Sequence, residues 1–331
     1  MLERKFAAIL GIYGKPSDRF MSGGYKSDAP NVFTRIEMAS KHGLVRGVEL
    51  IQGEDADIHP GNKNAVQAAL ADHGLEVCAI NPNLWGEPRW FKGTLGSTDP
   101  KIFRQAIDSI KLSIDLAAEL HCEYVGLWPG QDGYDYLFEV DYLRLYDQWV
   151  QGMQELADYN PAIKLGLEYK PYEPRTHSVI STAPKTLLML HDIDRPNVGL
   201  TLDVGHALYA RENLGETVAL SQRQSKLFHL HLNDNFADWD WDLNFGVVHL
   251  FDFIEMIYWL KRTGYSGWYS IDIFAYRMDA ADAIDESLSW LKSMLEFVED
   301  IGTEQFDQFL VSGDPLLVSE FFRKNLFPSR R

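Results

Sequence analysis

The sequence predicts a (β/α)₈ TIM barrel, and three observations support this fold class. Eight short β-rich runs alternate with longer amphipathic stretches over 331 residues, and such alternation indicates parallel strands joined by helical crossovers. Eight βα units in a chain of this length are typical of a closed barrel. The rival fold, an open doubly wound sheet, usually carries a G-x-G-x-x-G turn after its first strand, and this sequence has none.

Each predicted element follows from hydrophobic patterning in chain order. Short apolar runs predict buried strands, and apolar residues at helical spacing predict the helices between them. The predicted strands are 6–13, 47–51, 76–81, 124–128, 164–169, 198–203, 227–232 and 268–274. The predicted helices are 31–42, 64–73, 100–120, 142–159, 183–193, 217–225, 250–263 and 281–301.

The C-terminal segment lies outside the eighth βα unit. It predicts one or two extra helices that pack against the barrel or against a neighbouring subunit. We therefore expect a barrel domain over 1–302 and a helical extension over 303–331. The apolar residues that this extension has to bury are Phe306, Phe309, Leu310, Phe321, Phe322 and Leu326.

Composition excludes several classes of protein. The net charge of −17 repels phosphate backbones, so we expect no nucleic-acid partner, and a DNA-repair endonuclease on this barrel is disfavoured. Cys78 and Cys122 do not form a C-x-x-C pair, which argues against a disulfide framework or a thiolate zinc site. No apolar run reaches the roughly 18 residues of a membrane helix, and the N-terminus does not resemble a signal peptide. We expect a cytoplasmic protein without a membrane partner.

Four candidate metal ligands lie at the ends of successive predicted strands. In a parallel barrel, ligands bind at the C-terminal ends of the strands. Glu168, Asp203, His231 and Asp272 are separated by 35, 28 and 41 residues, close to the roughly 30 residues of one βα unit. We expect their side chains to converge. Three carboxylates and one imidazole suit Mn²⁺, with Mg²⁺, Co²⁺ and Zn²⁺ also compatible.

A second group of candidate ligands follows the same strands. His206 lies three residues after Asp203. Asp240 and Asp242 lie two residues apart in the loop after the seventh predicted strand. If Asp203 binds both cations, then Asp203, His206, Asp240 and Asp242 could hold the second one. Asp238 competes with Asp242 for the last position, and the sequence leaves this alternative open.

Charge balance favours two cations. Lys170 lies two residues after Glu168, so both side chains point to the same side of the strand. Two divalent cations and Lys170 balance five carboxylates that would otherwise crowd one cavity. Each like-charged pair at about 4 Å costs roughly 4 kcal/mol at an effective dielectric near 20. The five carboxylates are Glu168, Asp203, Asp240, Asp242 and Asp272.

These motifs resemble the xylose isomerase-like TIM-barrel superfamily, and within it the two-metal isomerases of the L-rhamnose isomerase and xylose isomerase kind. Glu168 with Lys170 resembles the family's Glu-x-Lys motif, and Asp203 with His206 resembles its acidic-x-x-His motif. His231 stands at the position of the strand-seven metal ligand. Asp240 and Asp242 resemble the Asp-x-Asp pair, and Asp272 resembles the final carboxylate.

The resemblance implies an aldose–ketose isomerase with two divalent metals per subunit, most often Mn²⁺, in a homodimer or homotetramer. The reaction is then a 1,2-hydride shift in an open-chain sugar. Lys170, Asp240 and His206 would take part in catalysis. The residues that would contact the sugar are Glu168, Lys170, His206, Trp128 and Trp85. The sequence shows neither a Gly-rich phosphate cradle nor an Arg cluster, so we expect a non-phosphorylated monosaccharide.

One departure from the family's pattern concerns ring opening, and a second function stays open as an alternative. The predicted third strand ends in Ile80-Asn-Pro-Asn83, without the histidine that opens the sugar ring in xylose isomerases. The alternative function is a ketose 3-epimerase of the tagatose/psicose type on the same fold, which uses two glutamates around one metal. Asp272 replaces the second of these glutamates, and Lys170 and the Asp-x-Asp pair have no role in that chemistry. The sequence therefore favours isomerisation.

Overall fold

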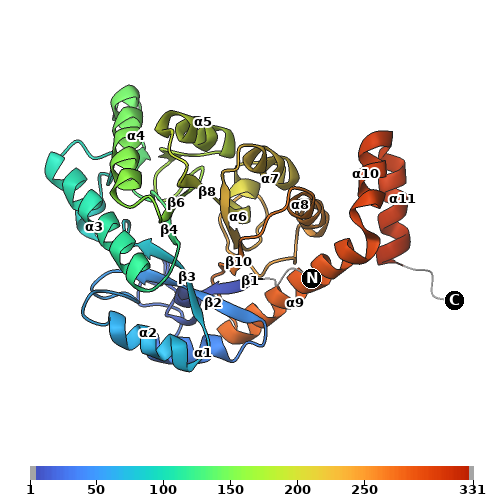
Figure 1. Cartoon of the computed structure of the whole chain (residues 1–331), viewed down its shortest axis with the longest axis horizontal. Coiled ribbons are helices and arrows are strands. Elements are labelled where there is room, and N and C mark those ends of the chain that lie inside the picture. The colour runs from blue at the N-terminus through green and yellow to red at the C-terminus, as the bar shows by residue number, and fades with distance from the viewer. Residues whose placement is uncertain (1–4, 328–331) are drawn as a thin grey trace.

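The computed structural model describes residues 5–327 and confirms the predicted barrel. Eight parallel strands close on themselves in the order β1-β10-β9-β8-β6-β4-β3-β2 (Figure 1). All eight predicted strands are present, although the first and last end earlier than expected. The barrel strands are β1 (Lys5–Ile9), β2 (Val45–Gln52), β3 (Glu76–Pro82), β4 (Tyr124–Leu127), β6 (Lys164–Glu168), β8 (Val198–Asp203), β9 (Leu227–Leu232) and β10 (Trp268–Ile271).

A ring of helices surrounds the strands (Figure 1). Side-chain caps fix several of their starts: Asn213 accepts a hydrogen bond from the backbone N of Glu216 at 2.7 Å, so the sixth predicted helix begins three residues before its predicted start at 217. The ring helices are α1 (Val32–Ser40), α2 (Lys63–Asp72), α3 (Pro100–Glu119), α4 (Tyr142–Tyr159), α5 (Ala183–Ile193), α7 (Leu214–Arg223), α8 (Leu250–Arg262) and α9 (Ala280–Ile301).

Short elements at the strand ends were not predicted from the sequence. Helix α6 (Val204–Tyr209) starts directly at the end of β8, and β5 (Gly133–Tyr134) pairs antiparallel with β7 (His177–Ser178). Two 3₁₀ turns, η1 (Leu10–Tyr13) and η2 (Pro88–Trp90), follow β1 and β3. These pieces are too short to show a hydrophobic period. They build the rim of the barrel where the candidate ligands lie.

Strand register brings the candidate ligands to one end of the barrel. Asp203 of β8 pairs with His231 of β9, and His231 pairs with Ser270 of β10. Asp272 lies two residues beyond Ser270, and Glu168 pairs with Thr201, two residues below Asp203. This stagger is the shear of a closed barrel. The four side chains therefore reach similar heights on neighbouring strands.

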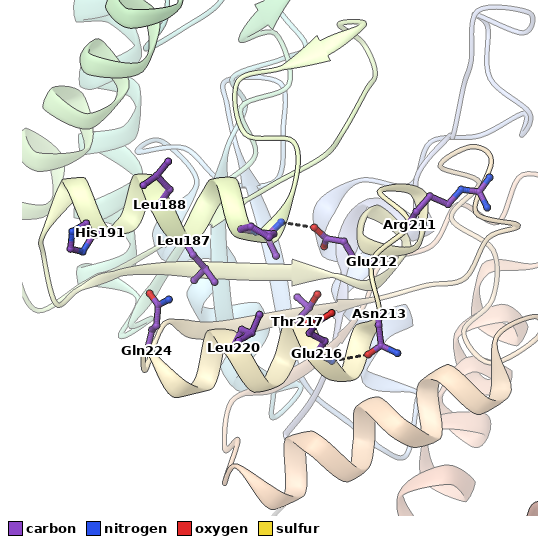
Figure 2. Close-up of a pocket in the computed structure, with 12 residues that line it drawn as sticks. Leu187, Leu188, His191, Arg211, Glu212, Asn213, Glu216, Thr217, Leu220 and Gln224 are labelled. Carbon is purple, nitrogen blue, oxygen red and sulfur yellow. Dashed lines mark hydrogen bonds between the residues drawn. The ribbon is translucent and has the colours of Figure 1, made fainter. Parts of the chain in front are cut away.

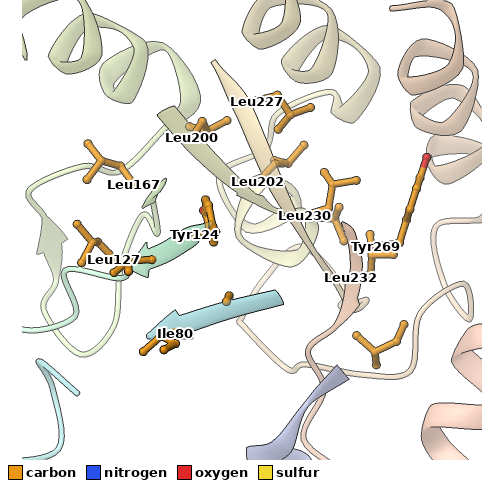
Figure 3. Close-up of a cluster of buried hydrophobic side chains, with 14 of the residues drawn as sticks. Ile80, Tyr124, Leu127, Leu167, Leu200, Leu202, Leu227, Leu230, Leu232 and Tyr269 are labelled. Atoms are coloured by element: carbon orange, nitrogen blue, oxygen red, sulfur yellow. The ribbon is translucent and has the colours of Figure 1, made fainter. Parts of the chain in front are cut away.

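Alternation along the strands separates polar from apolar side chains. Leucines such as Leu167, Leu202 and Leu230 are fully buried and belong to the main hydrophobic core (Figure 3). The side chains of the residues between these leucines point to the other face of the sheet, because successive side chains in a strand point to opposite faces. Several of these are buried polar groups, including Thr201 and His229. The interior of this barrel therefore contains several buried polar groups.

The C-terminal extension forms two further helices, α10 (Thr303–Ser312) and α11 (Pro315–Leu326). They stand out from the ring beside α8 (Figure 1). Phe306 is buried, and the rings of Phe309 and Phe321 meet at 5.1 Å. Leu310 was expected to be buried, but it is 49% exposed because it faces away from this cluster.

The predicted domain boundary at 302 and the predicted homodimer or homotetramer stay predictions. Residues 1–4 of the predicted barrel domain and 328–331 of the predicted extension lie outside the described residues. Within 5–327, no helix combines the length and the hydropathy needed to cross a bilayer.

The polar barrel interior gives a stability prediction at Gly166 of β6. A Cβ at this position would overlap the hydroxyl of Tyr124 and lie 2.7 Å from Thr201 Oγ1. Tyr124 is a rigid buried ring that hydrogen-bonds Thr201, so it cannot move away cheaply. We expect Gly166→Ala to lower the free energy of unfolding by about 2 kcal/mol, measured by urea denaturation.

Gly43 provides the matched control. A Cβ there meets nothing within 4 Å, so Gly43→Ala should change the free energy of unfolding by less than about 0.5 kcal/mol. Equal effects of the two substitutions would contradict this account of the barrel interior.

Candidate metal centre

The four residues predicted at the strand ends do converge, and we call them the tetrad: Glu168, Asp203, His231 and Asp272. One ligand atom from each lies within 4.8 Å of the others. The Nδ1 atom of His231 lies 3.4 Å from Glu168 Oε2, 3.4 Å from Asp272 Oδ2 and 4.0 Å from Asp203 Oδ2. All four side chains are largely buried, with Asp272 the most exposed at 22%.

Asp203, His206 and Asp240 form a second group, which we call the second cluster. Their ligand atoms also lie within 4.8 Å of one another. His206 Nε2 lies 3.2 Å from Asp240 Oδ2, and His206 Nδ1 lies 3.9 Å from Asp203 Oδ1. Asp203 thus belongs to both groups, as the bridging hypothesis requires.

Helix α6 places His206 beside Asp203. The side chain of Asp203 caps this helix by accepting a hydrogen bond from the backbone N of His206 at 2.9 Å. The amide of Asn233 donates to both Asp203 oxygens, at 3.2 and 3.0 Å. Asn235 in turn donates to the carbonyl of Gly205 at 2.8 Å, which ties the loop after β9 to α6. The orientation of Asp203 is therefore fixed from two sides.

The loop that carries Asp240 and Asp242 is braced at both ends. The backbones of Asp234 and Leu243 exchange hydrogen bonds of 3.0 and 2.8 Å. The buried carboxylate of Asp234 accepts from the backbone N of Val248 at 2.7 Å. The carbonyl of Asp242 accepts from the backbone N of Phe274, after β10, at 2.9 Å. These bonds hold the loop over the tetrad.

Asp242 and Asp238 have different surroundings. Asp238 accepts a hydrogen bond from the indole of Trp241 at 2.9 Å on the exposed side of the loop. Burial raises the pKa of Asp242 well above its usual range, and the charges of Asp240, Asp272 and Asp203 raise it further. Asp242 therefore faces the carboxylates, although among the described residues it is not within the 4.8 Å group of the second cluster. Its role as a ligand stays a prediction.

Lys170 lies at the edge of the second cluster. Its Nζ is 2.7 Å from Asp240 Oδ2 and 2.8 Å from Glu173 Oε2. It also lies 5.2 Å from the centre of the Trp128 ring, and the ring of Trp85 lies 5.3 Å from that of Trp128. Burial alone would lower the pKa of Lys170, but Asp240 and Glu173 outweigh burial and raise it. The ammonium is therefore charged at neutral pH.

The electrostatics of both groups fit divalent cations. Burial raises the pKa of Asp272 to about 8, with Asp203 and Glu168 adding to the rise against the opposing charge of His231. Within these two groups, three buried atoms have no hydrogen-bond partner, namely Nδ1 of His206, Nδ1 of His231 and Oδ1 of Asp240. Crowded carboxylates and unpartnered imidazole nitrogens are what a bound cation would satisfy. The mostly oxygen donor set suits Mn²⁺ or Mg²⁺.

Sequence reasoning missed Glu49 and Glu173. Glu49 lies fully buried on β2, and its two carboxylate oxygens contact His229 Nε2 at 2.7 Å and His231 Nε2 at 3.2 Å. Its only sequence signal is a carboxylate inside the apolar run 47–51. Glu173 has a left-handed backbone, with φ of 68°, and no motif in the sequence announces its contact with Lys170.

A separate groove lies on the outside of the barrel between α5 and α7 (Figure 2). Its volume is about 670 Å³, and its walls include Leu187, Leu188 and Leu220. The polar groups at its end hydrogen-bond to the helices. Glu212, for example, accepts from the backbone N of Ala183, the first residue of α5, at 2.8 Å. No residue of the tetrad or the second cluster lines it. The groove is therefore distinct from the candidate metal centre.

Comparison with known proteins identifies the family. The model described as "Xylose isomerase-like TIM barrel" matches residues 36–294, and the chain belongs to this family. Xylose isomerase of Thermus thermophilus is 30% identical over 222 residues, and that of Thermus caldophilus is 28% identical over the same length. Each match covers 65% of this chain and 57% of the relative. The chain thus spans little more than half the length of these curated relatives.

Solved structures share the whole fold. A D-tagatose 3-epimerase-like protein superposes with a TM-score of 0.69 at 24% identity, covering 89% of this chain and 98% of the other. An L-ribulose 3-epimerase gives 0.71 at 16% identity, covering 93% and 98%. A D-psicose 3-epimerase from Clostridium cellulolyticum H10 gives 0.70 at 17% identity, covering 88% and 99%. At these identities the likeness shows the fold.

The raised pKa values give a pH prediction for protein stripped of metal by a chelator. Burial alone would lower the pKa of His206, but Asp203 and Asp240 raise it to about 9, so the stability it contributes is lost as the pH rises through 9. Asp272, with a pKa of about 8, keeps a proton that the unfolded chain loses near pH 4, and this also makes stability fall with rising pH. We expect the free energy of unfolding to fall between pH 6.5 and 9, by roughly 2–3 kcal/mol per group, because one pKa unit corresponds to about 1.4 kcal/mol.

Saturating Mn²⁺ should abolish this fall, because the cation replaces the protons that the clusters hold. Glu168 and Asp240 do not complicate this range, since their lowered pKa values place their titration in acid. Urea denaturation at each pH measures the effect. Parallel pH profiles with chelator and with Mn²⁺ would contradict the assignment of a metal centre.

Proposed function

We propose that this protein is a metal-dependent aldose–ketose isomerase, an intramolecular oxidoreductase that converts a free monosaccharide by a 1,2-hydride shift. One observation carries the proposal. Asp203 is shared between the tetrad and the second cluster, and the ammonium of Lys170 lies 2.7 Å from the carboxylate of Asp240 in that cluster. Two adjoining cation sites with a lysine at their edge are the arrangement that the two-metal sugar isomerases use.

The residues present would hold two cations. Glu168, Asp203, His231 and Asp272 would bind one, and Asp203, His206 and Asp240 would bind the second, with Asp242 beside it. Cations held by these residues would supply Lewis-acid chemistry, which polarises a sugar carbonyl and neutralises charge on adjacent sugar oxygens. Mn²⁺ suits the oxygen-rich donor set best, and Mg²⁺, Co²⁺ and Zn²⁺ are compatible.

Lys170 is assigned to the sugar carbonyl oxygen. An ammonium has three N–H donors, and the contacts with Asp240 and Glu173 use two of them. The third is available to a substrate. A fixed donor aimed at an oxygen that becomes negative in the transition state lowers the barrier, because it needs no reorganisation at that moment.

Asp240 and His206 orient the reacting hydroxyl. Burial alone would raise the pKa of Asp240, but Lys170 and His206 outweigh burial and lower it. Asp240 is therefore an ionised acceptor for a hydroxyl at C1 or C2. His206 holds this carboxylate through its Nε2, at 3.2 Å.

The indoles of Trp128 and Trp85 form an apolar wall beside Lys170. Such a wall keeps water away from the reacting carbons and stacks against the carbon face of a sugar. The sequence has neither a Gly-rich phosphate cradle nor an Arg cluster, which supports a non-phosphorylated substrate.

One observation favours a second candidate, a ketose 3-epimerase. The tetrad alone offers a complete four-ligand site for a single cation, and the solved structures with this fold include several named as ketose 3-epimerases. In this reading Glu168 and Asp272 would exchange protons with C3 of the ketose. The pairing of Lys170 with Asp240 would then have no catalytic purpose, which is why we rank this candidate second.

A sugar panel distinguishes the two reactions. Protein stripped of metal and reloaded with Mn²⁺ is incubated with free aldoses and ketoses, and products are separated by chromatography. We expect interconversion of an aldose and a ketose that depends on added Mn²⁺. Conversion of a ketose only into another ketose would establish the epimerase instead.

Lys170→Ala tests the assigned role of the lysine. We expect turnover to fall by about 10²–10³-fold, the usual cost of removing one transition-state donor, while Mn²⁺ binding measured by calorimetry is retained.

Lys226→Ala is the matched control, because Lys226 is also partly buried and hydrogen-bonded, but to backbone carbonyls of Arg195 and Val198 at the opposite end of the barrel. It should keep full turnover. Unchanged turnover in Lys170→Ala would overturn the role of Lys170.

A further inference from the structure

A buried polar network lies directly beneath the tetrad, on the side of His231 that faces away from the carboxylates. Its centre is Glu49 of β2, which is fully buried. Glu49 Oε1 contacts His229 Nε2 at 2.7 Å, and Glu49 Oε2 contacts His231 Nε2 at 3.2 Å. The amide of Asn81 donates to the same Oε2 at 2.9 Å. Both oxygens of this carboxylate are therefore occupied by donors.

The two nitrogens of His231 face opposite surroundings. Nε2 points to Glu49, whereas Nδ1 has no hydrogen-bond partner and lies 3.4 Å from Glu168 Oε2 and from Asp272 Oδ2. A metal ligand must be the neutral imidazole, and because a carboxylate can only accept, the contact with Nε2 places the single proton of that neutral ring on Nε2. Nδ1 is then left with its lone pair directed at the tetrad.

We propose that Glu49 is the positioning residue of the metal centre: it fixes the tautomer and the ring orientation of His231, so that Nδ1 is the metal ligand. This inference rests on the proposed metal site. In metal sites of proteins, such an outer carboxylate also makes the imidazole more basic, and its loss typically weakens metal binding by 10–100-fold.

The surroundings of Glu49 hold it in place. His229 stacks on the ring of Tyr124, with centres 4.8 Å apart, and the Tyr124 hydroxyl hydrogen-bonds Thr201. The rings of His229 and His231 are perpendicular, with centres 5.3 Å apart. His231 can therefore rotate only by breaking its bond to Glu49 and losing this packing.

The network acts as support and is not itself a cation site. Glu49, His229 and His231 do bring ligand atoms within 4.8 Å of one another. However, the ring nitrogens that point at Glu49 already contact its oxygens at 2.7 and 3.2 Å. Both oxygens of Glu49 are thus satisfied without a cation, whereas the tetrad and the second cluster contain buried atoms that have no hydrogen-bond partner.

Glutamate is required at this position because all three partners donate. A glutamine has one acceptor oxygen and an NH₂ group that donates. In Glu49→Gln that NH₂ would face a donor in a dry interior, or His231 would turn its proton to Nδ1 and lose its lone pair toward the tetrad. We expect Glu49→Gln to raise the Kd of Mn²⁺ alone by about 10–100-fold. The measurement is a titration of the chelator-stripped full chain, with free Mn²⁺ detected by electron paramagnetic resonance.

Two controls separate this role from general destabilisation. Asp132 is an equally buried carboxylate that accepts from the backbone N of Thr94 and Gly96, at 2.9 and 2.7 Å, and touches no candidate ligand. Asp132→Asn should lower the melting temperature and leave the Kd of Mn²⁺ unchanged. In a His231→Gln background, adding Glu49→Gln should weaken Mn²⁺ binding no further, because Glu49 acts through His231.

The wild-type protein provides a test that needs no variant. In Zn²⁺-loaded protein labelled with ¹⁵N-histidine, NMR should show His231 with its proton on Nε2 and the metal on Nδ1. This measurement decides the question if Glu49→Gln does not fold. Metal on Nε2, or the same Kd in Glu49→Gln and wild type, would overturn the role of Glu49 while leaving the proposed function intact. Failure of the wild type to bind Mn²⁺ would overturn both.

Discussion

The upper end of this barrel is organised around one carboxylate, Asp203. It ends β8, caps α6 and takes two hydrogen bonds from Asn233. It is also the member common to both groups of candidate ligands. A buried carboxylate with so many roles has almost no freedom to move. The positions of His206, of the loop after β9 and of the tetrad all follow from its placement.

Buried negative charge has to be compensated, and this chain compensates it with different groups at different positions. Below the tetrad, the imidazoles of His229 and His231 face Glu49. Beside the second cluster, Lys170 pairs with Asp240. These groups leave uncompensated the carboxylates around Asp203, whose pKa values are raised mainly by burial and further by their mutual repulsion. The charge that remains in the middle of the centre is the charge that the proposed cations would neutralise.

The sequence was sufficient for the fold and for the convergence of the tetrad, because both follow from one repeat. Each βα unit returns the chain to the same end of the barrel, so residues spaced by about one unit meet there. The same logic could not find Glu49. Glu49 lies on β2 and contacts His229 and His231 of β9 across the interior of the barrel. Such a contact depends on the stagger of the strands, which no residue spacing in the sequence indicates.

Local geometry also limited prediction around Asp203 and Lys170. Helix α6 has six residues and begins inside the motif that joins Asp203 to His206, so no apolar period marks it. Glu173 contacts Lys170 from a left-handed backbone conformation, which its residue type does not predict. The choice between Asp238 and Asp242 depended on which carboxylate turns inward, a property of the braced loop rather than of composition.

The ligands of the two groups all come from residues 168 to 272, in the second half of the chain. The first half contributes Glu49 from deep inside and the loop indoles Trp85 and Trp128 at the rim. Among the described residues, the loops after β1, β2 and β3 therefore carry none of the candidate ligand atoms of these two groups. Under the proposed function, substitutions in these loops would change which sugar is accepted without altering the candidate cation ligands.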